Sequence, residues 1–142
     1  GHDAVISSVR FRNFDPQTLL TAVKASGVKR LIMVGGAGSL EAKPGVQLVD
    51  TPDFPTAAKP EALAGRNALN LLRAEAALDW TFLSPSAVIA PGERTGKFRL
   101  GKDEVLIGPD GKSRISIPDY AIALVDELEH PRHVRRRFTV GY

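Results

Sequence analysis

Short, unbroken apolar runs alternate with amphipathic stretches along this chain. Residues 3–9, 28–34 and 78–84 each contain an apolar run of strand length that ends at serine, glycine or proline. Residues 15–27 and 60–77 instead repeat apolar residues at helical spacing. Parallel strands carry unbroken apolar runs because helices cover both faces of their sheet. The pattern therefore predicts parallel strands that are joined by helices through right-handed crossovers.

The predicted helices have recognisable ends. Asp15 suits the N-cap of the first helix, Pro16 its first helical position and Gly27 its C-terminal end. A last helix is expected to start at Ile117-Pro118-Asp119 and to stop at His130-Pro131. Within it, Asp119 is interpreted as a capping residue of the first turn rather than as a catalytic acid.

Turn signals mark the remaining stretches. Residues 41–59 are rich in Pro-Gly and X-Pro pairs and are expected to form a long loop, of the kind that walls or covers a pocket, with a brief strand at residues 46–49 as an alternative. Residues 87–101 are interpreted as a second loop. A hairpin is predicted to pair residues 104–107 with residues 113–115 around a Pro-Asp-Gly turn. The final strand is expected over residues 137–140.

Composition indicates a single domain over residues 1–142. There is no cysteine and the three histidines are scattered, so we expect neither a disulfide nor a metal site. No stretch approaches the roughly 20 apolar residues of a membrane span. The formal charge of +3 is mild, and the arginines at positions 132 and 135–137 lack interleaved aromatics, which favours a solvated strand entrance over a nucleic-acid surface. We expect a cytoplasmic protein that binds neither nucleic acid nor membrane.

Four segments together resemble one protein family. They are Asp3-Ala-Val-Ile-Ser-Ser-Val, Leu31-Ile-Met-Val-Gly-Gly-Ala-Gly-Ser, Leu78-Asp-Trp-Thr-Phe-Leu-Ser-Pro-Ser and Ile115-Ser-Ile-Pro-Asp-Tyr-Ala-Ile-Ala-Leu-Val-Asp. These segments resemble the later half of atypical short-chain dehydrogenase/reductases, in the NAD(P)H-binding group that includes NmrA-like proteins and NADH-flavin or biliverdin-B-type reductases. The resemblance implies an α/β fold, with a Rossmann-like parallel sheet and flanking helices, and NAD or NADP as the cofactor.

The family's dinucleotide fingerprint does not occur in this sequence. In the family, a Gly-x-x-Gly-x-x-Gly turn after the first strand places the pyrophosphate at a helix N-terminus. Here the glycine group Gly35-Gly-Ala-Gly38 follows a later strand and is interpreted as a tight strand exit. We therefore expect the carboxyl half of such a domain, without its N-terminal βαβ unit. The strand at residues 3–9 would then present an apolar edge, which predicts self-association or pairing with the missing half.

The usual catalytic pair of short-chain dehydrogenases, Tyr-x-x-x-Lys, is also missing. The family register places the tyrosine position at Ala62 and the lysine position at Arg66. Arg66 is either a ribose or phosphate contact or an exposed helix arginine. Lys59, just before the helix, is a second and equally weak candidate.

Serines and glycines after the strands are the remaining candidate site residues. Ser39 is the other weak catalytic candidate, although a turn role is favoured and the matching family position could instead be Gly36. By resemblance, Ser7 and Ser8 would contact the cofactor ribose or phosphate, and Gly35 and Gly36 would let it approach the backbone. Ser84, Pro85 and Ser86 would form a wall beside the nicotinamide, and their alternative is a polar cluster that ends a strand.

Three functions fit these expectations. The first is hydride transfer from a reduced nicotinamide to a flavin, a quinone or a similar small planar acceptor, which needs no protein acid because solvent can protonate the product. The second is a non-catalytic dinucleotide-sensing regulator, as among NmrA-like proteins. The third is a nucleoside-sugar epimerase or dehydratase relative, and the absent tyrosine weighs against it.

Overall fold

The computed structural model describes all residues from Gly1 to Tyr142 and contains a central five-stranded sheet with the order β1-β2-β5-β9-β7. The strands are β1 (Ala4–Ser7), β2 (Arg30–Val34), β5 (Asp79–Ser84), β9 (Arg136–Gly141) and β7 (Arg99–Gly101). The first four are parallel and β7 runs antiparallel to β9. The predicted Rossmann-like parallel sheet is therefore confirmed. The carboxyl ends of its four parallel strands lie at the same end of the sheet.

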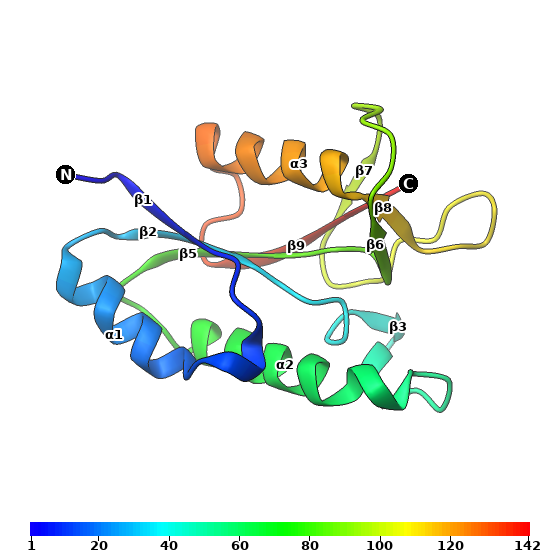
Figure 1. Ribbon diagram of the computed structural model, residues 1–142, viewed down its shortest axis with the longest axis horizontal. Helices are drawn as coiled ribbons and strands as arrows, with labels where there is room; N and C mark the ends of the chain where they lie inside the picture. Colours follow the sequence, from blue (N-terminus) through cyan, green and yellow to red (C-terminus); the bar gives the residue numbers. More distant parts are fainter.

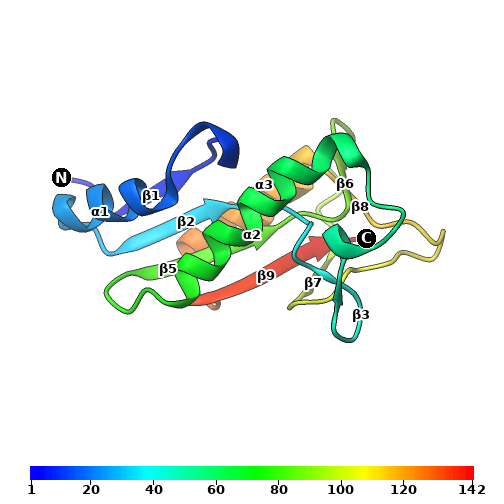
Figure 2. The ribbon, with the colours of Figure 1, turned by 90° about the horizontal axis from the view of Figure 1, so that it is seen from below.

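Helices cover both faces of this sheet (Figure 1). The helices α1 (Pro16–Ser26) and α2 (Lys59–Arg73) lie on one face, and α3 (Ile117–Glu129) lies on the other. Figure 2 shows α2 crossing the near face of the sheet, with α3 behind it. Two hydrophobic clusters fill the layers, one around Trp80 and Phe82 and the other around Phe138 and Tyr120.

The helix ends follow the sequence signals at α1 but not at α2. Asp15 accepts a hydrogen bond from the Gln17 amide at 3.2 Å, and Gly27 takes the left-handed conformation with φ of 83°. The predicted extension of the second helix to Ala77 is wrong, since α2 ends at Arg73. Glu75 ends the helical run because its carboxylate accepts from the Ala77 amide at 2.7 Å and pairs with Lys24 at 2.8 Å.

The segment predicted as a long loop, residues 41–59, consists of short regular pieces, and a strand begins at Val46 as the alternative interpretation allowed. An antiparallel pair joins β3 (Glu41–Lys43) and β4 (Val46–Gln47). Two 3₁₀ turns follow, η2 (Leu48–Asp50) and η3 (Thr56–Ala58), and a third, η1 (Phe11–Asn13), precedes α1. These pieces bring the segment back toward the N-terminus of α2.

The predicted hairpin over residues 104–107 and 113–115 is wrong. Its turn forms, since the Gly108 amide donates to the Lys112 carbonyl at 2.9 Å. However, β8 (Arg114–Ser116) pairs in parallel with β6 (Val88–Ala90), inside the stretch that was predicted as loop. The reason is that a partner distant in sequence satisfies the β8 backbone, and local turn signals carry no information about such a partner.

β1 lies at the edge of the sheet, with β2 as its only strand neighbour. Ile6 of this edge strand is exposed. None of the helices is both long enough and apolar enough to cross a membrane.

Candidate functional site

A cavity of about 720 Å³ lies where the carboxyl ends of β1, β2 and β5 meet. Its lining comes from residues 8–11, 34–38 and 85–89, which follow or end these three strands, and from residues between 48 and 62. The walls are mainly apolar. Ligands of open α/β sheets bind outside the carboxyl ends of the strands, so this cavity is the candidate functional site.

Five of the predicted cofactor-binding residues line this cavity: Ser8, Gly35, Gly36, Pro85 and Ser86. Parallel pairing explains their convergence, because Ser7 is in register with Met33 and Met33 with Phe82, so the residues after the three strands emerge side by side. The expected pocket wall from the segment after β4 also forms, through Thr51, Phe54 and their neighbours.

The two glycines after β2 meet different surroundings. A Cβ atom built on Gly35 would lie 2.2 Å from the Phe82 ring, so packing inside the chain already requires glycine there. A Cβ atom on Gly36 would have no heavy atom within 4 Å. Gly36 has an ordinary negative φ, so neither packing nor backbone conformation requires its lack of a side chain. Its open surroundings belong to the cavity.

Ser39 and Ser84 do not line the cavity but hold a buried arginine. The Arg137 guanidinium donates to Ser39 Oγ at 2.9 Å, to the Ser39 carbonyl at 3.2 Å and to Ser84 Oγ at 3.3 Å. It also pairs with Asp103 at 2.9 Å, and its side chain is 2% exposed. Burial lowers the pKa of Arg137, and the bond to Asp103 opposes that effect. Arg137 therefore joins the ends of β2 and β5, and the solvated entrance expected for residues 135–137 is wrong at this position.

The remaining predicted residues lie beside the cavity rather than in its lining. Arg66 bonds to Gln47 at 3.0 Å and Asp50 at 2.8 Å, which fixes η2 against α2. Lys59 is exposed at the start of α2, and Ser7 is buried at the end of β1. Their roles toward a cofactor stay predictions.

Three ionisable residues of the lining, Arg10, Asp53 and Glu61, were not among the predicted site residues. Glu61 was interpreted only as a favourable charge in the first helical turn. Its Oε1 accepts from the Arg12 amide at 3.3 Å, whereas its Oε2 is buried without a hydrogen-bond partner in the chain. Only the meeting of α2 with η1, which sequence spacing does not encode, places this carboxylate at the cavity.

Both tyrosines are committed elsewhere. Tyr120 donates to the Leu83 carbonyl at 2.7 Å, and burial raises the pKa of its hydroxyl above the usual range. Tyr142 donates to Asp119 at 2.6 Å. The cavity lining contains no tyrosine, lysine or histidine. A protein proton donor of the usual short-chain dehydrogenase kind is therefore not among the residues that line it.

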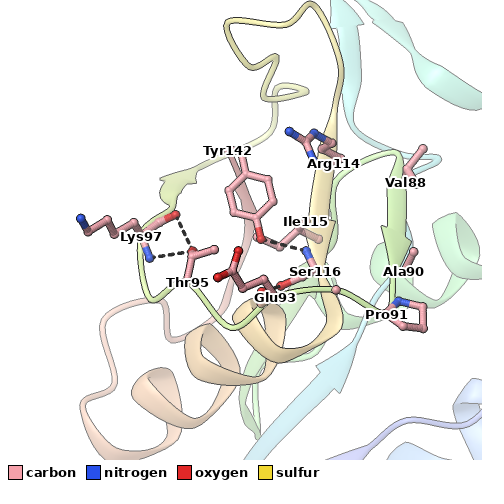
Figure 3. Close-up of a pocket in the computed structure, with 11 residues that line it drawn as sticks. Val88, Ala90, Pro91, Glu93, Thr95, Lys97, Arg114, Ile115, Ser116 and Tyr142 are labelled. Atoms are coloured by element: carbon pink, nitrogen blue, oxygen red, sulfur yellow. Dashed lines mark hydrogen bonds between the residues drawn. The ribbon is translucent and has the colours of Figure 1, made fainter.

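A second cavity of about 470 Å³ lies beside β6 and β8 (Figure 3). Its walls are held by Asp119, whose carboxylate accepts from the Thr95 hydroxyl at 2.6 Å, the Gly96 amide at 2.9 Å and Tyr142. Although burial alone would raise the pKa of Asp119, these bonds lower it to about 2. The capping role expected for Asp119 is wrong, because Ser116 caps α3 by accepting from the Asp119 amide.

A cluster of charged side chains lies at the opposite end of the sheet, where the strands begin. Glu127 is buried and accepts from Arg30 at 2.9 Å, from His133 Nδ1 at 2.7 Å, and from the amides of Arg132 and His133 at 3.0 Å. Burial alone would raise the pKa of Glu127, but the hydrogen bonds from His133 and Arg132 hold it below its usual value. The structure contains no group of three or more side chains arranged to hold a metal ion.

A family model described as NAD(P)H-binding matches residues 1–131. The uncharacterized protein YwnB of Bacillus subtilis is 47% identical over 128 residues, which cover 87% of this chain and 60% of that protein. This chain thus spans about 60% of the length of that curated relative.

Crystal structures of similar proteins share the fold over the whole chain. One from Bacteroides thetaiotaomicron, provisionally named an epimerase, is 46% identical with a TM-score of 0.93 and covers 100% of this chain and 68% of its own. One from Streptococcus pneumoniae, provisionally named an NADH-flavin reductase, is 39% identical with a TM-score of 0.83, over 99% of this chain and 72% of its own.

Proposed function

Because this chain belongs to the NAD(P)H-binding family, we propose that the cavity at the ends of β1, β2 and β5 holds the nicotinamide half of NADH or NADPH. The observation that carries this proposal is the convergence of Ser8, Gly36 and Pro85 on one cavity at the sheet edge where α/β folds bind nucleotides. The cofactor would contact these residues together with Gly35 and Ser86.

The residues present fit such a group. The cavity volume, about 720 Å³, is within the usual range for small-molecule sites. Gly36 leaves open space where a side chain would intrude. Val9 and Val88, 52% and 58% exposed, supply apolar surface on two sides of the cavity, which suits a flat ring.

We further propose that the protein is an oxidoreductase that passes a hydride to a flavin, a quinone or a similar planar acceptor. A bound reduced nicotinamide supplies the hydride. The chain's own contribution is to place two rings face to face and to keep water from the space between them, by means of the apolar walls. The lining offers no tyrosine or lysine to donate a proton, which suits an acceptor that takes its proton from solvent.

A dinucleotide-sensing regulator is the second candidate, and the same lack of a proton donor favours it. A nucleoside-sugar epimerase or dehydratase is the third, in line with the provisional name of the Bacteroides protein. The commitment of Tyr120 and Tyr142 to other partners weighs against this third candidate.

Nicotinamide oxidation tests the proposal directly. The full-length protein is mixed with NADPH or NADH and with FMN or a quinone, and the absorbance of the reduced nicotinamide is followed. Turnover that Gly36→Val abolishes, and that substitution of the exposed Lys43 of β3 by alanine leaves intact, would support the reductase. Dinucleotide binding without turnover would favour the regulator, and no binding would contradict the proposed site.

Arg66 offers a narrower test of cofactor contact. If the guanidinium reaches the ribose or a phosphate, Arg66→Ala weakens dinucleotide binding. Unchanged affinity would leave Arg66 with its bonds to Gln47 and Asp50 alone.

We propose that residues 1–142, produced by themselves in solution, associate through β1. The support is that β1 has one strand neighbour and exposes Ile6. In a protein that has the N-terminal half of the domain, that half would cover the same edge. A monomer by light scattering at high concentration would contradict association of the isolated chain. A cytoplasmic location, where NADH and NADPH are available, belongs to the same proposal.

A further inference from the structure

Residues 51–58 form one wall of the cavity at the ends of β1, β2 and β5. Thr51, Phe54 and Pro55 of this segment line the cavity. Hydrogen bonds within the segment hold its backbone, since the Phe54 amide donates to the Thr51 carbonyl at 3.2 Å and the Ala58 amide to the Pro55 carbonyl at 3.1 Å. These local bonds fix the place of the Phe54 side chain at the cavity.

Phe54 differs from the other phenylalanines of the chain. Five of the six phenylalanines pack in or against the two hydrophobic clusters: Phe11, Phe14, Phe82, Phe98 and Phe138. Phe54 belongs to neither cluster and is half-buried. The other aromatic residue of the lining, Phe11, is 7% exposed and stacks on Phe82 with 6.0 Å between the ring centroids. The ring of Phe54 is therefore the aromatic surface that the chain leaves accessible at this cavity.

We infer that Phe54 stacks on the planar ring of the hydride acceptor, an inference that rests on the proposed function. In that function the nicotinamide lies at the strand ends, beside Ser8, Gly36 and Pro85. A second ring placed against it is left with the remaining walls, which include residues 51–58. Aromatic rings attract one another in offset stacks beyond the effect of buried area alone. The inferred substrate class is therefore an acceptor with an extended aromatic ring system, such as a flavin.

Steady-state kinetics of the full-length protein with NADPH and FMN test this inference. Phe54→Leu keeps an apolar side chain and removes the ring, so the KM for FMN should rise about three- to tenfold. Phe54→Tyr keeps the ring and should retain the wild-type KM. The matched control is Phe98→Leu, which removes a half-buried phenylalanine that packs against the second hydrophobic cluster, outside this cavity. This control should leave the KM for FMN unchanged.

A fluorescence measurement detects the stacking itself. The chain has one tryptophan, Trp80, which is 2% exposed in the first hydrophobic cluster. Phe54→Trp adds a second tryptophan at the cavity wall. FMN should quench the fluorescence of this variant more strongly than that of the wild type, because a ring stacked on the new indole quenches it directly. Equal quenching of the two proteins would contradict the inference.

The kinetic outcomes separate the inference from the proposed function. A KM for FMN that Phe54→Leu leaves unchanged, or that Phe98→Leu raises equally, would overturn the inference while the proposed function stands. The same holds if Phe54→Leu weakens the binding of NADPH and leaves the KM for FMN unchanged, since the ring would then contact the nicotinamide. Failure of the wild type to oxidise NADPH with FMN or a quinone would instead overturn the proposed reductase function.

Discussion

The two ends of the parallel sheet each carry a glutamate, buried Glu127 at one end and half-buried Glu61 at the other, and the two carboxylates have different surroundings. At the amino ends of the strands, both oxygens of Glu127 have partners, and the cavity beside it is about 210 Å³. At the carboxyl ends, one oxygen of Glu61 has no partner and the cavity is about 720 Å³. The chain itself thus satisfies the carboxylate at the amino ends, the closed end, although Arg30 Nε beside it has no partner. The carboxyl ends keep the larger cavity, with mainly apolar walls.

This difference between the two ends of the sheet predicts which substitutions change the stability of the protein and which change its affinity for a ligand. Arg30 and His133 satisfy Glu127, and Thr81 links them by accepting from Arg30 and donating to the His133 carbonyl, both at 2.7 Å. Substitutions at this end should therefore change stability and leave ligand affinity intact. Substitution of Gly36 should do the reverse.

The largest effect is expected at the closed end. Glu127→Ala should lower the free energy of unfolding by about 3–5 kcal/mol, because it leaves Arg30, 13% exposed, without its counter-charge. Denaturant unfolding measures this change. Dinucleotide affinity of the folded fraction should be unaltered, and a coupled loss of affinity would contradict the separation of the two ends.

Arg137 links the sheet core to the cavity, so its removal should affect both properties. Arg137→Met leaves the Ser39 carbonyl and the two serine hydroxyls without their donor, which should cost about 2–4 kcal/mol of unfolding free energy. The segments that line the cavity after β2 and β5 would also lose their common anchor, so dinucleotide affinity should fall. Asp103→Asn is the milder comparison, because Asp103 is 55% exposed and can be solvated. Equal effects of the two variants would show that the serines do not need Arg137.

The adjacent glycines give the sharpest local comparison. Gly35→Ala should destabilise the protein by about 1–3 kcal/mol, because the new methyl group meets the fully buried Phe82 ring. Gly36→Ala should leave the melting temperature nearly unchanged, since nothing lies within 4 Å of its Cβ position, and should weaken dinucleotide binding. Equal melting temperatures for the two variants would contradict the packing described for Gly35.

The smallest effect is a pH dependence at the closed end. The hydrogen bonds on Glu127 hold its pKa below the usual value of 4.5, so its contribution to stability is present above about pH 4.5 and is lost as the pH falls further. Glu127→Gln should be less stable at neutral pH and should show a flatter decline below pH 4.5. An unchanged acid profile in the variant would show that Glu127 does not set it.

Local signals in the sequence were enough for the four parallel strands and most helix ends, but β7 lies within residues 87–101, which were predicted as a loop. The apolar runs that became β1, β2 and β5, and the Asp15 and Gly27 caps, depend on neighbouring residues alone, so they were predicted. The pairing of β6 with β8 depends on residues that are distant in sequence, and it was missed.

In the candidate site, too, the residues that could be predicted depend on local sequence, and those that could not depend on contacts between distant residues. Residues that directly follow strands could be placed at the cavity because parallel strands end together, as Ser8, Gly36 and Pro85 do. The burial of Arg137 and the position of Glu61 arise from contacts between separate elements. Charged side chains in a sequence resemble surface residues until such contacts are known.

A crystal structure of the full-length protein with NADPH tests the central claim most directly. The account predicts the nicotinamide ring in the cavity lined by Ser8, Gly36 and Pro85, at the carboxyl ends of β1, β2 and β5. A nicotinamide ring bound beside Tyr142, in the cavity next to β6 and β8, or anywhere out of contact with Gly36, would contradict it.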